Sequence, residues 1–215
     1  MKPTIVLIAL LSLTLIAFEL ERSLVSEEMV FDELLKAFSL EKAVHMLESR
    51  AARGSWPYYI VLTVYTIIRL LVVTLVMTTS LYLFDIKSHF SSAFYSVVSA
   101  DFVHLFPAVV KFVWFNSIQT TYSFQDLREF PRFSIVDIVN LLWIRDDRLI
   151  DSAISQLNSF NVFEVFFCLL LAKQLSTRQG LEFQKVFSAT AYAYFFGLAL
   201  VAIVFAYLSV IIQTR

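Results

Sequence analysis

The sequence predicts an all-α, polytopic membrane protein, a bundle of about five transmembrane helices with amphipathic helices at the interface. Its composition points this way, because 59% of the 215 residues are hydrophobic and 16% are charged. Soluble domains have about 45–50% apolar and about 25% charged residues. The chain has only 3 glycines and 4 prolines, which favours long helices over tight turns. The run 56–84, where Arg69 is the one charged residue, exceeds the roughly 20 residues that cross a bilayer.

We predict one integral membrane domain over residues 1–215, with spans at 5–20, 56–84, 90–118, 154–172 and 186–212. The first apolar run has a second interpretation, a secretory signal peptide, but no small-x-small cleavage site follows it. Lys and Arg in short segments near the spans favour the cytoplasmic side. Lys2, Lys87 and Lys173 therefore favour a cytoplasmic N-terminus, against which the basic residues of 21–55 argue.

Two polar stretches separate the spans. In the amphipathic segment 21–55, apolar residues recur at helical spacing and a second helix is expected from N-cap Ser39 to Gly54. This segment lies on the membrane surface or forms a solvated hairpin. The polar connection 119–153 is expected to contain interfacial helices over 134–144 and 148–157. Its carboxylates Asp146, Asp147 and Asp151 are similar to an Asp-rich magnesium site, but without a second such motif a helix N-terminal charge cluster is the better interpretation.

Arg69 and Glu164 are each placed near the middle of a predicted span. A charge at the centre of a membrane helix costs at least about 2.5–3.5 kcal/mol, so it usually faces a partner inside the bundle. We therefore expect Arg69 and Glu164 to meet across the second and fourth spans, with Tyr65 and Thr66 adding hydrogen bonds. The pair either fixes helix register or forms part of a polar site or ion path.

The third span carries a polar stripe of Asp101, His104 and Lys111, because spacings of three and seven return to one face of a helix. Pro107 removes a backbone hydrogen bond and should kink this helix. The stripe either faces a wet, partly interfacial groove or forms a proton relay, since His changes charge near neutral pH.

Ala189, Ala193 and Gly197 form a ladder of small residues on the uncharged fifth span. Four-residue spacing places all three on one face, which suits close helix packing. The alternative is a lipid-facing stripe that holds small residues by chance.

No catalytic pattern is present: the sequence lacks a Gly-rich phosphate loop, His-Glu-x-x-His and Gly-x-Ser-x-Gly. We therefore predict a protein that is not an enzyme, with no cofactor and no metal site. The single cysteine, Cys168, lies in an apolar run and is predicted to be a buried, inert thiol. The net charge of −1 gives no reason to expect a nucleic acid partner.

Several segments resemble the Ypt/Rab-interacting (YIP) family of five-span membrane proteins as it occurs in bacteria. The resemblance rests on 157–163 (LNSFNVF), 169–172, the connector 175–180 (LSTRQG), and 90–94 (FSSAF) leading to Pro107. It covers roughly residues 60–212, and the charged segment 21–55 is an insertion relative to the family pattern. The resemblance implies five helices, a cytoplasmic N-terminus and a role in membrane organisation without catalysis.

The sequence as a whole favours a non-enzymatic scaffold or accessory subunit of YIP-like type in the bacterial cytoplasmic (inner) membrane. Its partners would be the lipid bilayer and either another protein or a second copy of the chain, bound through 21–55 and 119–153. The alternative is a small transporter or proton-conducting subunit that uses Arg69, Glu164, Asp101 and His104. A membrane-embedded enzyme is the third possibility.

Overall fold

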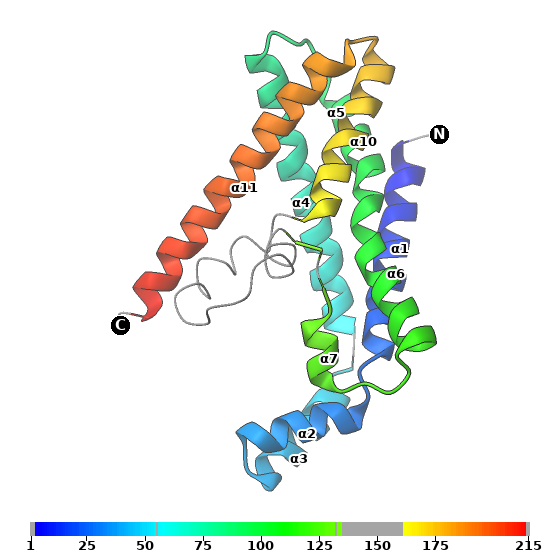
Figure 1. The fold of residues 1–215 in the computed structure, drawn as a ribbon, viewed down its shortest axis with the longest axis vertical. Helices are drawn as coiled ribbons and strands as arrows, with labels where there is room; N and C mark the ends of the chain where they lie inside the picture. Colours follow the sequence, from blue (N-terminus) through cyan, green and yellow to red (C-terminus); the bar gives the residue numbers. More distant parts are fainter. Residues whose placement is uncertain (1–2, 55, 132, 135–160, 214–215) are drawn as a thin grey trace. The chain divides into compact units, whose positions relative to one another are not determined.

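The computed structural model of the chain describes residues 3–54, 56–131, 133–134 and 161–213, and this described part is all-α (Figure 1). The elements in chain order are α1 (Pro3–Ser23), α2 (Glu27–Ala37), α3 (Leu40–Arg53), α4 (Trp56–Leu83), α5 (Phe90–Ala100), the 3₁₀ helix η1 (Asp101–Leu105), α6 (Phe106–Val113), the π-helical turn η2 (Trp114–Ile118), α7 (Phe124–Glu129), α10 (Val162–Gln179) and α11 (Phe183–Gln213). The predicted helices at 134–144 and 148–157 fall almost entirely outside the described residues, as does the Asp146, Asp147, Asp151 cluster.

Three helical stretches among the described residues are long and apolar enough to cross a membrane: Pro3–Ser23, Trp56–Leu83 and Phe90–Ile118. They agree with the predicted spans 5–20, 56–84 and 90–118 and are consistent with an integral membrane protein. The other two predicted spans correspond to α10, which has 18 residues, and α11, which has 31 residues. Five spans in total stay a prediction.

The predicted bounds of the fourth span, 154–172, were wrong. Helix α10 begins at Val162, after N-cap Asn161, whose Oδ1 accepts a hydrogen bond of 3.0 Å from the Glu164 backbone N–H. It continues past Lys173 to Gln179 and ends at Gly180, which has a φ of 64°. Glu164 therefore lies in the first turn of the helix rather than near its middle. An acidic side chain is favourable there because the helix dipole places partial positive charge at the N-terminus.

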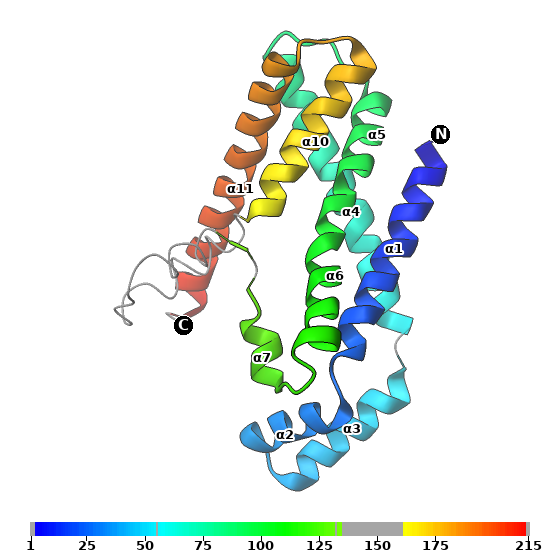
Figure 2. The same cartoon turned by 45° about the vertical axis from the view of Figure 1, so that its right-hand side comes forward.

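The chain divides into two compact units. Unit 1 comprises Met1–Leu7, Arg69–His104 and Pro131–Arg215, and unit 2 comprises Ile8–Ile68 and Leu105–Phe130. In unit 1, α10 packs against both α5 and α11 (Figures 1 and 2). Val97, Phe167, Leu171, Leu175 and Val186 are fully buried there. The Ser80 hydroxyl donates to the Ala189 carbonyl across 2.9 Å, which ties α4 to α11.

Unit 2 has its own small core of Leu24, Phe115 and Leu127, against which Phe112 and Phe130 pack. The hairpin of α2 and α3 belongs to this unit. Its second helix ends at Arg53, before Gly54 with a φ of 65°, as predicted. The segment 119–153 contains a helix that the sequence analysis missed, α7, which starts in a capping box between Ser123 and Asp126.

Pro107 interrupts the third span. Proline cannot donate a hydrogen bond to the carbonyl four residues earlier, here that of Val103, and its ring clashes with that turn. The chain tightens into a 3₁₀ helix over Asp101–Leu105 and resumes as α6, with Pro107 in its first turn. Side chains three residues apart eclipse each other in a 3₁₀ helix. Asp101 and His104 are therefore brought to the same side of the chain.

Candidate intramembrane polar site

Arg69 of α4 forms an ion pair with Asp101, through Nη2 and Oδ2. The Asp101 side chain is 6% exposed and that of Arg69 is 34% exposed. Taking two such charges out of water is unfavourable, and their direct, charge-assisted hydrogen bond offsets that cost. The pair links α4 to the start of η1, where Pro107 has reshaped the helix.

His104 lies between two carboxylates. Its Nε2 is 3.8 Å from Oδ1 of Asp101 and 3.8 Å from Oε2 of Glu164. The imidazole ring also packs on Phe167 of α10, with 5.1 Å between ring centroids. The side chain is only 16% exposed, so packing fixes its position between the two acids.

Glu164 completes the group from α10. Its carboxylate accepts a hydrogen bond from the Tyr194 hydroxyl of α11. The Tyr194 ring packs on Phe167 as well, at 5.1 Å between centroids. The Phe167 ring thus contacts both His104 and Tyr194.

Five side chains of unit 1 therefore form one polar network, contributed by α4, η1, α10 and α11. Its members in order are Arg69, Asp101, His104, Glu164 and Tyr194. The described residues contain no group of three or more His, Cys, Asp or Glu that could hold a metal ion.

Arg69 and Glu164 belong to one network, as the sequence analysis expected of residues on the second and fourth spans, but they form no direct ion pair among the described residues. Arg69 bonds to Asp101, and Glu164 bonds to Tyr194. Periodicity within one helix cannot identify the partner on another helix, and Asp101 was available on the adjacent span. The expected neighbours of Arg69 do not join it either: Thr66 donates to the Leu62 carbonyl at 2.8 Å, and the Tyr65 side chain is 61% exposed.

The other predicted residues form no side-chain hydrogen bond or ion pair with this network among the described residues. Lys111 is in α6 and belongs to unit 2. Ala189 and Ala193 are buried in unit 1, at 0% and 8% exposure. A methyl group added at Gly197 would meet nothing within 4 Å. The ladder therefore contacts the rest of the chain through its alanines and leaves space at its glycine.

The sequence analysis missed Tyr194 altogether. A tyrosine inside a long apolar helix is itself a signal, because a buried hydroxyl usually has a hydrogen-bond partner. Cys168, one turn from Glu164 on α10, is buried, as the sequence analysis expected. The nearest acid to Tyr194 could be found only from the packing of α10 on α11.

Unit 1 also contains a hollow of about 230 Å³ at the turn between α4 and α5. Its lining residues are Thr78, Tyr82, Ile86, Lys87, Ser88 and His89. None of the five network residues lines it. The polar network is therefore packed among side chains rather than opened onto this hollow.

Comparison with protein-family models, with characterised proteins and with solved structures finds nothing that matches this chain.

Proposed function

We propose that the protein is a non-enzymatic integral membrane scaffold or accessory subunit. The observation that carries the proposal is the α2–α3 hairpin. No residue of α2 is buried. Apolar side chains of the two helices and of the C-cap between them are exposed: Leu35, Phe38, Leu40, Val44 and Met46, at 38–62%. Exposed apolar side chains grouped on one element are typical of a surface that binds a partner.

The polar network of unit 1 supports a structural role for the membrane-embedded part. Arg69, Asp101, Glu164 and Tyr194 each bond to another member of the network. In apolar surroundings such pairs specify which helices are neighbours and in which register. The scaffold would thus have a rigid helical part and a binding hairpin. A YIP-like role in membrane organisation, in a bacterial cytoplasmic membrane, belongs to the same proposal and draws on the sequence resemblance.

Affinity purification of the full chain in mild detergent, followed by mass spectrometry, tests this function. The variant Leu40→Ser/Val44→Ser should lose a co-purifying protein, or a second copy of the chain, that the parent retains. The matched control Glu41→Gln/Glu48→Gln changes two polar residues of α3 and should retain it. A parent chain that purifies alone as a monomer, or a partner retained equally by both variants, would contradict the proposal.

A second function, a small transporter or proton-conducting subunit, is favoured by His104. His104 lies between two carboxylates, each with an oxygen 3.8 Å from its Nε2, and chains of acidic residues and histidines form the proton relays of membrane pumps. Proton flux into liposomes containing the purified chain tests this role. Flux in the parent that is lost in His104→Gln would establish it, whereas a parent without flux leaves only the structural role.

A further inference from the structure

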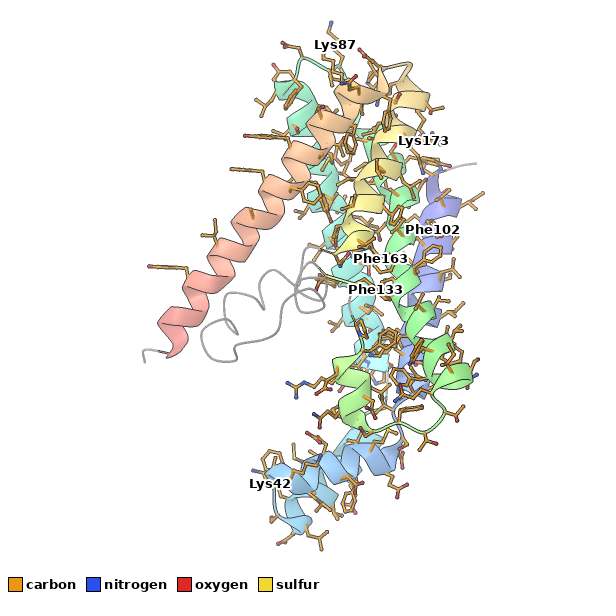
Figure 3. The ribbon with its side chains drawn as sticks, viewed as in Figure 1. Lys42, Lys87, Phe102, Phe133, Phe163 and Lys173 are labelled. Atoms are coloured by element: carbon orange, nitrogen blue, oxygen red, sulfur yellow. The ribbon has the colours of Figure 1, made fainter. Side chains whose placement is uncertain are left out.

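Positive charge gathers at one end of unit 1, where the turn from α4 to α5 and the turn from α10 to α11 both lie (Figure 2). Its exposed cations are Lys87, Lys173, Arg178 and Lys185, and its acids are Asp85 and Glu182. Figure 3 shows Lys87 and Lys173 toward this end. None of the four cations forms an ion pair within the described residues. We call these four residues the basic end.

Side-chain bonds hold the two turns together. Gln179 Nε2 donates to Ser88 Oγ at 2.8 Å and so joins the end of α10 to the α4–α5 turn. The Arg178 guanidinium lies over the Tyr95 ring, 3.5 Å from its centroid. Ser176 Oγ donates to the Leu181 carbonyl at 2.6 Å and closes the α10–α11 turn around Gly180. These contacts fix the two turns that carry the basic residues.

The hollow of about 230 Å³ opens at this same end. Its lining is mostly apolar, and Lys87, Ser88 and His89, whose side chains carry hydrogen-bond donors, border it. One water occupies about 30 Å³, so the hollow has room for a phosphate group. Tyr82, which lines it, is 79% exposed, and the adjacent Leu83 is 75% exposed. The hollow therefore has cationic and hydroxyl groups beside bare apolar surface.

We propose that the basic end binds the headgroup of an anionic phospholipid, with its phosphate in the hollow beside Lys87, Ser88 and His89. The other three cations supply positive charge around the headgroup, and the acyl chains lie along Tyr82 and Leu83. Charge complementarity selects an anionic ligand, and the exposed apolar side chains select a lipid over a soluble phosphate. This binding requires only that unit 1 is in a membrane and does not depend on the scaffold role.

Native mass spectrometry of the delipidated full chain in detergent, titrated with phosphatidylglycerol or with phosphatidylcholine, tests the proposal. The parent should bind phosphatidylglycerol at least several-fold more tightly. Each Lys or Arg near an anionic membrane surface strengthens attraction about fivefold. Lys87→Gln/Lys185→Gln should therefore raise the apparent Kd for phosphatidylglycerol about twentyfold. The control Lys36→Gln/Lys42→Gln, with the same charge change on the α2–α3 hairpin, should leave it within twofold.

Three results would overturn the proposal. The first is equal affinity for the two lipids. The second is an unchanged Kd in Lys87→Gln/Lys185→Gln when circular dichroism shows that the variant is folded. The third is full competition by millimolar inorganic phosphate, which would show that the hollow takes a small anion rather than a lipid. Loss of the scaffold's protein partner in the hairpin variants has no bearing on any of these readouts.

Discussion

Asp101 is the residue whose loss should disturb unit 1 most. In Asp101→Asn the guanidinium of Arg69 keeps its charge but loses its counter-charge. Removing one partner of a buried pair costs about 3–5 kcal/mol. We expect the lower end of that range, because the Arg69 side chain is 34% exposed. Unfolding in detergent, followed by circular dichroism, measures the change. The double variant Arg69→Gln/Asp101→Asn should recover part of the loss, and an Asp101→Asn variant as stable as the parent would refute the pairing.

The contribution of the Tyr194 hydroxyl can be measured against a matched control, because a second tyrosine, Tyr192, lies two residues away on α11. Tyr194→Phe keeps the ring that packs on Phe167 and removes the hydroxyl that bonds to Glu164. A hydrogen bond to a charged group contributes about 1.5–3 kcal/mol, so the variant should be less stable by about that amount. Tyr192, which is 66% exposed, has no hydroxyl hydrogen bond in the described residues, so Tyr192→Phe should change the unfolding free energy little. Equal effects of the two substitutions would show that the Glu164 bond contributes nothing.

Replacing glycine with alanine should have opposite effects on stability at the C-cap of α10 and inside α11. Gly180 caps α10 with a φ of 64°, where an alanine costs about 1–2 kcal/mol. Gly197 is inside α11, where alanine is better than glycine by about 0.5–1 kcal/mol. An added Cβ meets nothing within 4 Å at either position, so backbone conformation alone decides the sign. Gly180→Ala should lower the unfolding free energy and Gly197→Ala should raise it. A destabilising Gly197→Ala would instead reveal a close neighbour, such as a second copy of the chain.

The N-terminus of α7 should be sensitive to pH. Backbone and side-chain hydrogen bonds from Ser123 hold the pKa of the exposed Asp126 carboxyl below its usual value. A depressed folded pKa means that the carboxylate stabilises the capping box above the unfolded-state pKa, and that this stabilisation is lost as pH falls through the folded pKa. Amide hydrogen exchange in α7 should therefore speed up in acid, once corrected for intrinsic rates. Asp126→Asn, which removes the titrating carboxyl, should abolish this pH dependence, and an unchanged profile in that variant would contradict it.

Elements were predictable where a local signal marks them. The apolar runs 56–84 and 90–118 and the stop at Gly54 match the helices because run length and glycine conformation act locally. The start of α10 was placed too early because Ile154, Leu157 and Phe160 were counted with the apolar run, although polar residues separate them. Hydropathy does not report that Asn161 caps the helix. Ser123 followed three residues later by Asp126 is a sequence pattern typical of a helix start, and it would have predicted α7. The bonds of Arg69 and Glu164 depend on which helices pack together, and no single helix encodes that.

At the scale of the whole molecule, two features of the chain suit a topology experiment. The 90–118 stretch is long and apolar enough to cross a membrane. The only cysteine, Cys168, is buried, so it should not react with a membrane-impermeant maleimide in the folded chain. Single cysteines at exposed positions then report which side of the membrane each connection faces.

If 90–118 crosses the membrane and α10 and α11 cross as a pair, the α4–α5 and α10–α11 turns face one side and α7 faces the other. Lys87→Cys and Lys185→Cys should therefore label from the same side, and Gln125→Cys from the opposite side, in sealed spheroplasts and in inverted vesicles. Basic residues near spans favour the cytoplasmic side, so Lys87→Cys should label in inverted vesicles. Labelling of all three from one side would show that 90–118 does not span, and Asp101 and His104 would then lie outside the hydrocarbon layer, where their network would carry no intramembrane role.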